Sequence, residues 1–166
     1  MTAFVAAILA AGLIAAAAPG PLDRIAAGES ASAVLGDWCS AHRLPPLHAD
    51  RLSRRKMPDG GVRSALEAAG DATIAYRRVR LACGPRAMSE ADNWYLPARL
   101  TPDMNRRLDT TDAPFGLVVK PLAFQRRTLA AGPGAHGHFV VRAVLIDQAG
   151  APFSYVVERY APLTSP

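Results

Sequence analysis

Polar and apolar residues alternate along much of the chain beyond residue 70, and a period of two is typical of half-buried strands. Turn-forming residues such as Gly84-Pro85 and the run from Asp147 to Pro152 separate the alternating segments. The pattern therefore predicts a meander of four or five antiparallel strands. The expected strands cover residues 73–83, 87–96, 117–129 (one long strand or a bent pair), 139–146 and 153–161.

Helical patterns lie mainly ahead of the strands. Residues 31–42 can place Ala, Leu, Trp and Cys on one broad apolar side, with Ser30 or Ser32 as the N-cap. A second helix is expected over 101–108, where Thr101 can cap and Pro102 suits the first turn. We expect residues 47–62 to be irregular and 62–69 to form a short helical or mixed segment. The layout predicts a single α+β domain, an antiparallel sheet with helices packed on it.

Two charged residues interrupt the apolar strand faces. Glu158 shares a face with Val156 and Tyr160, and Arg77 shares a face with Val79 and Leu81. A charge on an apolar face is costly to bury unless a partner or a ligand compensates it. An inward arginine and an inward glutamate on separate strands suit a small, oxygen-rich anionic ligand. The alternative for Glu158 is a structural ion pair, with Arg77 or Arg142 as its partner.

The first residues differ in composition from the remainder. Residues 3–18 carry no charge and are rich in alanine, with an Ala-x-Ala pattern near residue 18. Such a segment is typical of a secretory signal peptide, although no Lys or Arg precedes it. We expect a signal peptide over 1–18 and the folded domain over 19–166, which places the protein in the periplasm or outside the cell. An uncleaved anchor in the inner membrane is the alternative, and it would give membrane association through this segment.

Composition narrows the partners further. The 166-residue chain carries a net charge of +5, with basic clusters such as Arg51–Lys56 and Arg126-Arg127 that we expect to be solvated faces. No nucleic-acid motif accompanies them, so we expect no nucleic-acid partner. We also expect a monomer. Cys39 and Cys83 leave two alternatives open, a disulfide or two buried thiols. His136 and His138 lack further ligands at metal spacing, so no metal site is expected.

An ordered set of motifs carries a family resemblance across roughly residues 30–162. The set comprises Arg77-x-Val79-x-Leu81-x-Cys83-Gly84, a strand ending at Pro97, a helix, Pro114-Phe115-Gly116, Gly150-Ala151-Pro152 and Glu158-x-Tyr160-x-Pro162. The chain resembles the chorismate pyruvate-lyases and their wider chorismate-lyase-like superfamily. That superfamily includes the ligand-sensing domains of GntR-type transcription regulators.

The resemblance implies roles for particular residues. Arg77 matches the arginine that holds the ligand carboxylate, and Glu158 matches the glutamate that contacts the ligand hydroxyl. Phe115 and Gly116 match the turn whose backbone contacts the same ligand. In a lyase, Arg77 and Glu158 would be the catalytic residues of a carbon–oxygen lyase that converts chorismate to pyruvate and 4-hydroxybenzoate for ubiquinone, without cofactor.

Two segments differ from the lyases. Asp92-Asn93-Trp94-Tyr95 replaces an Ala-Arg-Thr-type sequence, and the Gly-rich run 130–138 replaces an arginine-rich flap, so we expect an altered pocket lid. Chorismate is also a cytosolic metabolite, whereas the leader directs export. The alternative to the lyase is therefore an exported binding protein that holds an aromatic carboxylate, or a similar small anion, without turnover.

Overall fold

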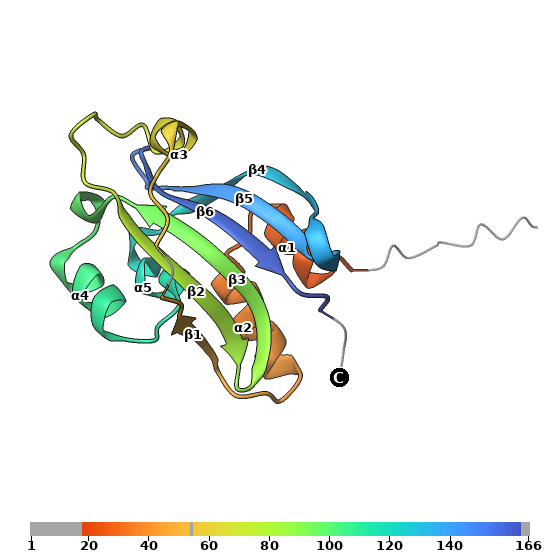
Figure 1. Cartoon of the computed structure of the whole chain (residues 1–166). Helices are drawn as coiled ribbons and strands as arrows, with labels where there is room; N and C mark the ends of the chain where they lie inside the picture. Colours follow the sequence, from red (N-terminus) through yellow and green to blue (C-terminus); the bar gives the residue numbers. More distant parts are fainter. Residues whose placement is uncertain (1–17, 54, 164–166) are drawn as a thin grey trace, which may run out of the picture.

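The computed structural model describes residues 18–53 and 55–163 and contains one antiparallel sheet of six strands in the order β1-β2-β3-β6-β5-β4. Figure 1 shows the helices distributed over this sheet. The predicted α+β fold is confirmed, with one strand more than the upper estimate. The predicted signal peptide, 1–18, lies outside the described residues except for Ala18. No helix in the described part of the chain has the length and apolar character needed to cross a membrane.

The elements follow the predicted order in part. They are α1 (Pro21–Ala26), α2 (Ala31–Ala41), β1 (Leu47–Arg51), α3 (Gly60–Ala65), β2 (Ala75–Cys83), β3 (Arg86–Tyr95), η1 (Pro97–Arg99), α4 (Pro102–Thr110), α5 (Phe115–Val118), η2 (Lys120–Leu122), β4 (Gln125–Pro133), η3 (Ala135–Gly137), β5 (Phe139–Ile146) and β6 (Pro152–Tyr160). Thr101 caps α4 as expected, because its hydroxyl accepts a hydrogen bond from the Met104 N–H at 3.2 Å.

Two predictions along the chain were wrong. The segment 47–62 is not irregular throughout, since β1 pairs with β2 from Leu47↔Cys83 to Arg51↔Val79. The segment 117–129 is not one strand or a bent pair, because α5 and η2 occupy its first half and β4 begins only at Gln125. A short apolar run is compatible with either a strand or a buried helix, and here helical packing determined the outcome.

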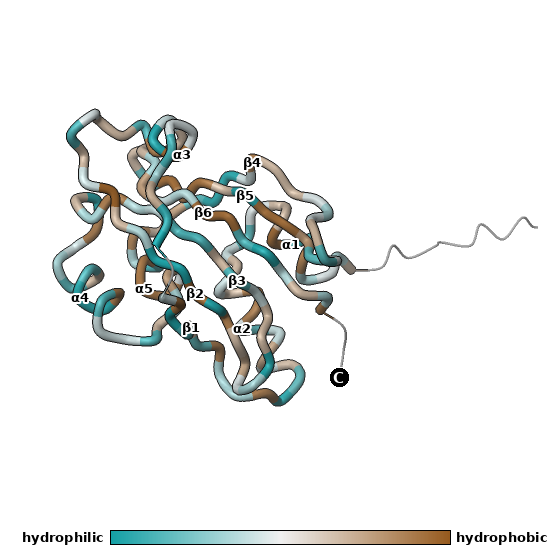
Figure 2. Tube along the Cα trace, viewed as in Figure 1, coloured by the Kyte–Doolittle hydropathy of each residue, from teal (hydrophilic) through white to brown (hydrophobic). Residues whose placement is uncertain are grey.

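Helices cover the two faces of the sheet unequally. On the face that we call the inner face, α1 and α2 pack over one half around Leu35 and Tyr160, and α4 and α5 pack over the other around Phe153. On the outer face, α3 covers a smaller cluster around Trp94. Hydrophilic and hydrophobic residues alternate along the strands in Figure 2, as this two-sided arrangement requires. The inner face therefore holds most of the core, and charges there are exceptional.

A disulfide joins the inner helix layer to the sheet. Cys39 in α2 bonds to Cys83 at the end of β2, with their Cα atoms 5.9 Å apart. That separation lies within the usual range for such a bridge. The next residue, Gly84, makes the β2–β3 turn with φ +59°, and a Cβ there would lie 2.8 Å from the Cγ of Pro45. Of the two alternatives for the cysteines, the structure therefore contains the disulfide.

Candidate functional site

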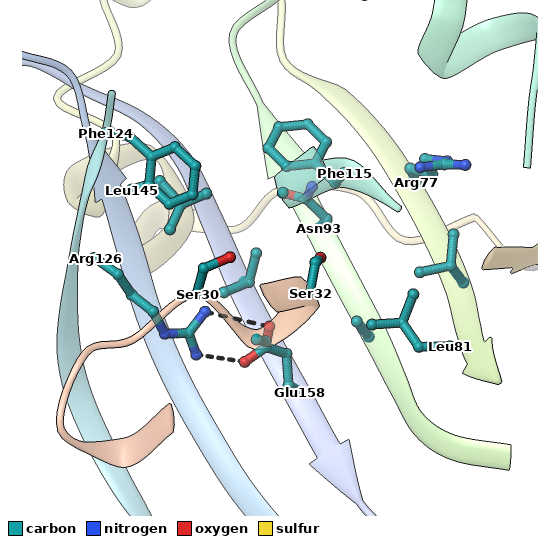
Figure 3. A pocket seen from close by; sticks show the side chains of 15 residues that line it. Ser30, Ser32, Arg77, Leu81, Asn93, Phe115, Phe124, Arg126, Leu145 and Glu158 are labelled. Carbon is teal, nitrogen blue, oxygen red and sulfur yellow. Dashed lines mark hydrogen bonds and ion pairs between the residues drawn. The ribbon is translucent and has the colours of Figure 1, made fainter. Parts of the chain in front are cut away.

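A cavity lies between the inner face of the sheet and the helices α2 and α5 (Figure 3). Its volume is about 40 Å³, which is room for about three water molecules. Apolar side chains form most of the wall, and a few polar groups converge on it. The lining residues are Ser30, Ala31, Ser32, Arg77, Val79, Leu81, Ala91, Asn93, Phe115, Gly116, Phe124, Arg126, Leu145, Val156 and Glu158.

Glu158 forms a buried ion pair with Arg126 across the floor of this cavity. Both carboxylate oxygens accept hydrogen bonds from the guanidinium, from Nη1 at 3.2 Å and from Nη2. Burial alone would lower the pKa of Arg126, but the adjacent carboxylate outweighs it and the pKa is raised. Burial and then the negative charge of Glu158 raise the pKa of the neighbouring Tyr160 well above its usual value. The negative charge of Glu158 is thus compensated by Arg126. The prediction that Arg77 or Arg142 would be its partner was wrong.

Arg77 lies on the opposite side of the cavity from this pair, and its guanidinium points away from it (Figure 3). Its Nη1 and Nη2 donate to the carbonyl oxygens of Ala113 and Thr111, at 3.1 and 3.4 Å. Burial is the main cause that lowers the pKa of Arg77, and the positive charge of Arg51 adds to it. Arg77 forms no ion pair with a residue of the described ranges, and the charges of Asp112 and Asp109 act on it only from a distance, so its positive charge is compensated in part.

The other polar groups of the cavity can donate hydrogen bonds. The Asn93 Oδ1 accepts from the Ser154 hydroxyl at 2.7 Å. This bond orients the amide so that its buried Nδ2 has no partner among the residues that the structure describes. Ser30 is the N-cap residue of α2, yet its side chain makes no capping hydrogen bond. The hydroxyls of Ser30 and Ser32 lie at the centre of the view in Figure 3, beside the positive end of the 11-residue helix α2. The free groups therefore favour a ligand that presents acceptors and negative charge.

Gly116 allows the helices α2 and α5 to approach each other at this point. A Cβ on Gly116 would lie 2.9 Å from the Oγ and 3.3 Å from the Cβ of Ser32. The neighbouring Phe115 is buried at 8 % exposure and packs against Tyr95, with the ring centroids 5.3 Å apart. The turn predicted at 114–116 is thus the start of α5, and it forms one wall of the cavity.

All four residues predicted for the site, Arg77, Phe115, Gly116 and Glu158, line this one cavity. Sequence reasoning missed Arg126, Asn93, Ser30 and Ser32 as lining residues. Asn93 shares a face of β3 with Ala91 and Tyr95, so the same counting of faces could have found it. Arg126 had no such signal, because its Arg126-Arg127 pair was interpreted as a solvated surface.

The two segments that were expected to alter the pocket lid, 92–95 and 130–138, lie elsewhere in the fold. Asn93 lies on the floor of the cavity, in a strand at the centre of the sheet, and not in a lid. The run 130–138 forms the end of β4 and η3, and none of its residues lines the cavity. Within the described residues, no three His, Cys, Asp or Glu side chains gather as the ligands of a metal ion would.

Comparison with known proteins gives one relative by sequence. No model of a known protein family matches the chain. The uncharacterized protein y4mC of Sinorhizobium fredii is 40 % identical over 160 aligned positions, which cover 79 % of this chain and 68 % of y4mC. The chain belongs to the y4mC family. Membership of this family assigns no activity, since y4mC is itself uncharacterized.

Solved structures identify the fold of this member of the y4mC family. PhnF from Mycobacterium smegmatis matches with a TM-score of 0.60 at 12 % identity, over 81 % of this chain and 64 % of PhnF. The separate effector domain of PhnF gives 0.58 at 11 %, over 77 % and 88 %. A GntR-family regulator from Enterococcus faecalis gives 0.52 at 13 %, over 69 % and 93 %. The chain therefore has the chorismate-lyase-like fold of the GntR effector-binding domains, and it spans about two thirds of whole PhnF.

Proposed function

We propose that this member of the y4mC family binds a small organic anion in the cavity between α2 and the sheet, without turning it over. The observation that carries the proposal is the polarity of the free groups. Asn93 Nδ2, the hydroxyls of Ser30 and Ser32 and the start of α2 can all donate hydrogen bonds, while Arg77 adds a positive charge that acidic residues compensate only in part. The apolar remainder of the wall suits a hydrocarbon or aromatic body.

The size of the cavity determines how much the wall must rearrange for each ligand. A free volume of about 40 Å³ is smaller than an aromatic ring, so side chains such as Phe124 must move before a benzoate can enter. Pyruvate and acetate need less rearrangement, and they carry the same carboxylate. We therefore propose that the carboxylate determines whether a compound binds, and that the wall side chains determine how large its body can be.

Calorimetric titration of the domain 19–166 with pyruvate, benzoate and 4-hydroxybenzoate tests the proposal. Asn93→Ala should weaken the binding of whichever acid binds by about tenfold, since a hydrogen bond to a charged group contributes about 1.5–3 kcal/mol. Arg77→Ala should weaken it as well, by about tenfold, through the loss of a positive charge at the wall, because the Arg77 Nη1 and Nη2 themselves donate to backbone carbonyls. Arg127→Ala is the matched control, because Arg127 is an exposed arginine beside Arg126. Equal affinity in all four proteins, or no binding of any acid, would refute the proposal.

A second candidate is the lyase reaction on chorismate, favoured by the presence of Arg77, Phe115, Gly116 and Glu158 in one lining. In that reaction the residues would hold the substrate and stabilise the charge that moves to the leaving ether oxygen. The Arg126–Glu158 pair favours binding over catalysis, because both carboxylate oxygens are already occupied. Incubation with chorismate decides between the two: pyruvate released above the uncatalysed rate supports the lyase, and its absence supports binding alone.

We also propose that the protein functions in an oxidising compartment outside the cytosol. The Cys39–Cys83 disulfide supports this location, since structural disulfides persist mainly in exported proteins. N-terminal sequencing of protein recovered from the cell envelope tests it. A start near residue 19 supports cleavage of a signal peptide, an intact Met1 in the envelope supports an anchor, and an intact Met1 in the cytosol refutes export.

A further inference from the structure

A second hollow lies beside the edge strand β1, separate from the cavity under α2. Its volume is about 170 Å³, and its lining contains four arginines and no carboxylate. Regular backbone bounds one side of it, because the Leu52 N–H donates to the Arg78 carbonyl oxygen at 3.0 Å and so extends the pairing of β1 with β2. The lining residues are Arg51, Leu52, Ser53, Arg55, Tyr76, Arg77 and Arg78.

Backbone contacts occupy only part of these arginines. Arg51 donates from Nη2 to the Leu108 carbonyl oxygen, and Arg77 donates to those of Thr111 and Ala113, all near the C-terminal end of α4. The C-terminal end of a helix carries partial negative charge, which explains why the two arginines lie there. A guanidinium has five N–H donors, and Arg51 uses one of them within the described residues, so most of its donors remain available there.

Acidic side chains compensate the charges of the four arginines only in part. Of its four arginines only Arg78 forms an ion pair with a residue that the structure describes, to Glu90 at 2.7 Å. Asp109 and Asp112 act on Arg77 through their charge alone, without a hydrogen bond to it. The positive charge of Arg51 contributes, after burial, to the lowered pKa of Arg77, so these two cations destabilise each other. An anion placed among them would relieve this repulsion.

We propose that this arginine hollow, beside β1, binds a phosphate or sulfate group through Arg51 and Arg55. A tetrahedral oxyanion has several acceptor oxygens, which match the paired N–H donors of a guanidinium group. The ligand is a free phosphate-bearing molecule or a lipid headgroup, both of which present the same chemistry. This site does not depend on the proposed carboxylate site, although Arg77 lines both.

The test is a calorimetric titration with inorganic phosphate at low ionic strength. The wild type and Arg127→Ala should bind phosphate alike, and Arg55→Ala and Arg51→Ala about tenfold more weakly, the loss expected for one charge-assisted hydrogen bond. Arg55 is exposed and makes no hydrogen bond within the described residues, so Arg55→Ala leaves the fold intact. Phosphate binding that is equal in all four proteins would overturn the proposal.

Vesicle flotation distinguishes the two sources of the phosphate group. Vesicles of phosphatidylglycerol in phosphatidylcholine are compared with phosphatidylcholine alone, using the same four proteins. Arg55-dependent binding to the anionic vesicles identifies a headgroup, and Arg55-dependent binding of phosphate alone identifies a soluble ligand. The absence of an Arg55-dependent signal in both assays refutes the site. Saturation with a carboxylic acid that displaces the phosphate would also refute it, because the phosphate would then occupy the cavity under α2.

Discussion

Arg126 on β4 and Glu158 on β6 meet across the intervening strand β5, and their side chains are only 4 % and 8 % exposed. Their register partners on β5 are Leu145 and Val141, so the ion pair crosses the inner face diagonally. A buried pair gains little over apolar residues of the same volume, but removal of one partner leaves a buried charge without compensation.

Single substitutions in this pair should therefore be much more destabilising than the double substitution. We expect Arg126→Met or Glu158→Leu to lower the free energy of unfolding by about 3–5 kcal/mol, and the double variant by less than either. Urea denaturation at pH 7 measures all three. Additive effects of the two single changes would contradict a direct pair, since independent sites add.

The close approach of Gly116 to Ser32 predicts a specific steric effect. Gly116→Ala should cost about 1–3 kcal/mol, because the new Cβ would lie 2.9 Å from the Ser32 Oγ and force α5 away from α2. Gly36→Ala in α2 is the matched control. A Cβ there meets nothing within 4 Å, and alanine is the better helix former, so this variant should gain about 0.5–1 kcal/mol. The same sign for both variants in urea denaturation would be inconsistent with this packing.

The disulfide predicts a redox-dependent stability. The bridge closes a sequence separation of 44 residues, for which chain entropy gives about 4 kcal/mol. The double variant Cys39→Ala/Cys83→Ala should lose about 3–4 kcal/mol. Dithiothreitol should lower the unfolding midpoint of the wild type towards that of the variant and leave the variant unchanged. A wild type that is insensitive to the reductant under unfolding conditions would argue against the bridge.

Tyr76 predicts a stability change at high pH. Burial, and then the hydrogen bond from its hydroxyl to Asp92 Oδ1 at 2.6 Å, raises the pKa of Tyr76 to about 12. Because the pKa is higher in the folded state than the unfolded value near 10, this stabilisation is fully present below pH 10. It is lost as the pH rises towards 12.

The comparison of wild type with Tyr76→Phe isolates this contribution from the other tyrosines. The difference between their unfolding free energies should decrease between pH 10 and 12, and Asp92→Asn should lower the spectrophotometric pKa of Tyr76 towards 10. A pKa of Tyr76 that is unchanged in Asp92→Asn would show that burial alone raises it.

The sequence predicted those parts of the fold in which local patterning and tertiary packing agree. The strand over 139–146 was predicted at the bounds it has, because β5 is flanked by partners on both sides and is apolar almost throughout. The strand β1 was missed, since it is an edge strand with Ala49 as its only buried residue and lacks an apolar alternation. Edge strands are often short and polar, since these properties reduce pairing with the strands of other chains.

The candidate site was predicted in part for a similar reason. Counting faces placed Arg77 and Glu158 on the inner face, because both lie in long, regular strands. The partner of Glu158 could not be predicted in this way, since β4 begins after an irregular segment and its register with β5 contains a bulge near Thr128. Only that register turns Arg126 inward and Arg127 outward.

The floor of the cavity joins two halves of the chain that are remote in sequence. Asn93 and Glu158 lie on β3 and β6, which pair at the centre of the sheet, so the floor exists only when the two halves are docked. A ligand that binds there must shift the unfolding equilibrium of the entire domain. At a hundred times its dissociation constant this amounts to about 2.7 kcal/mol. Melting temperature can therefore serve as a screen for the unknown ligand, whatever chemistry follows binding.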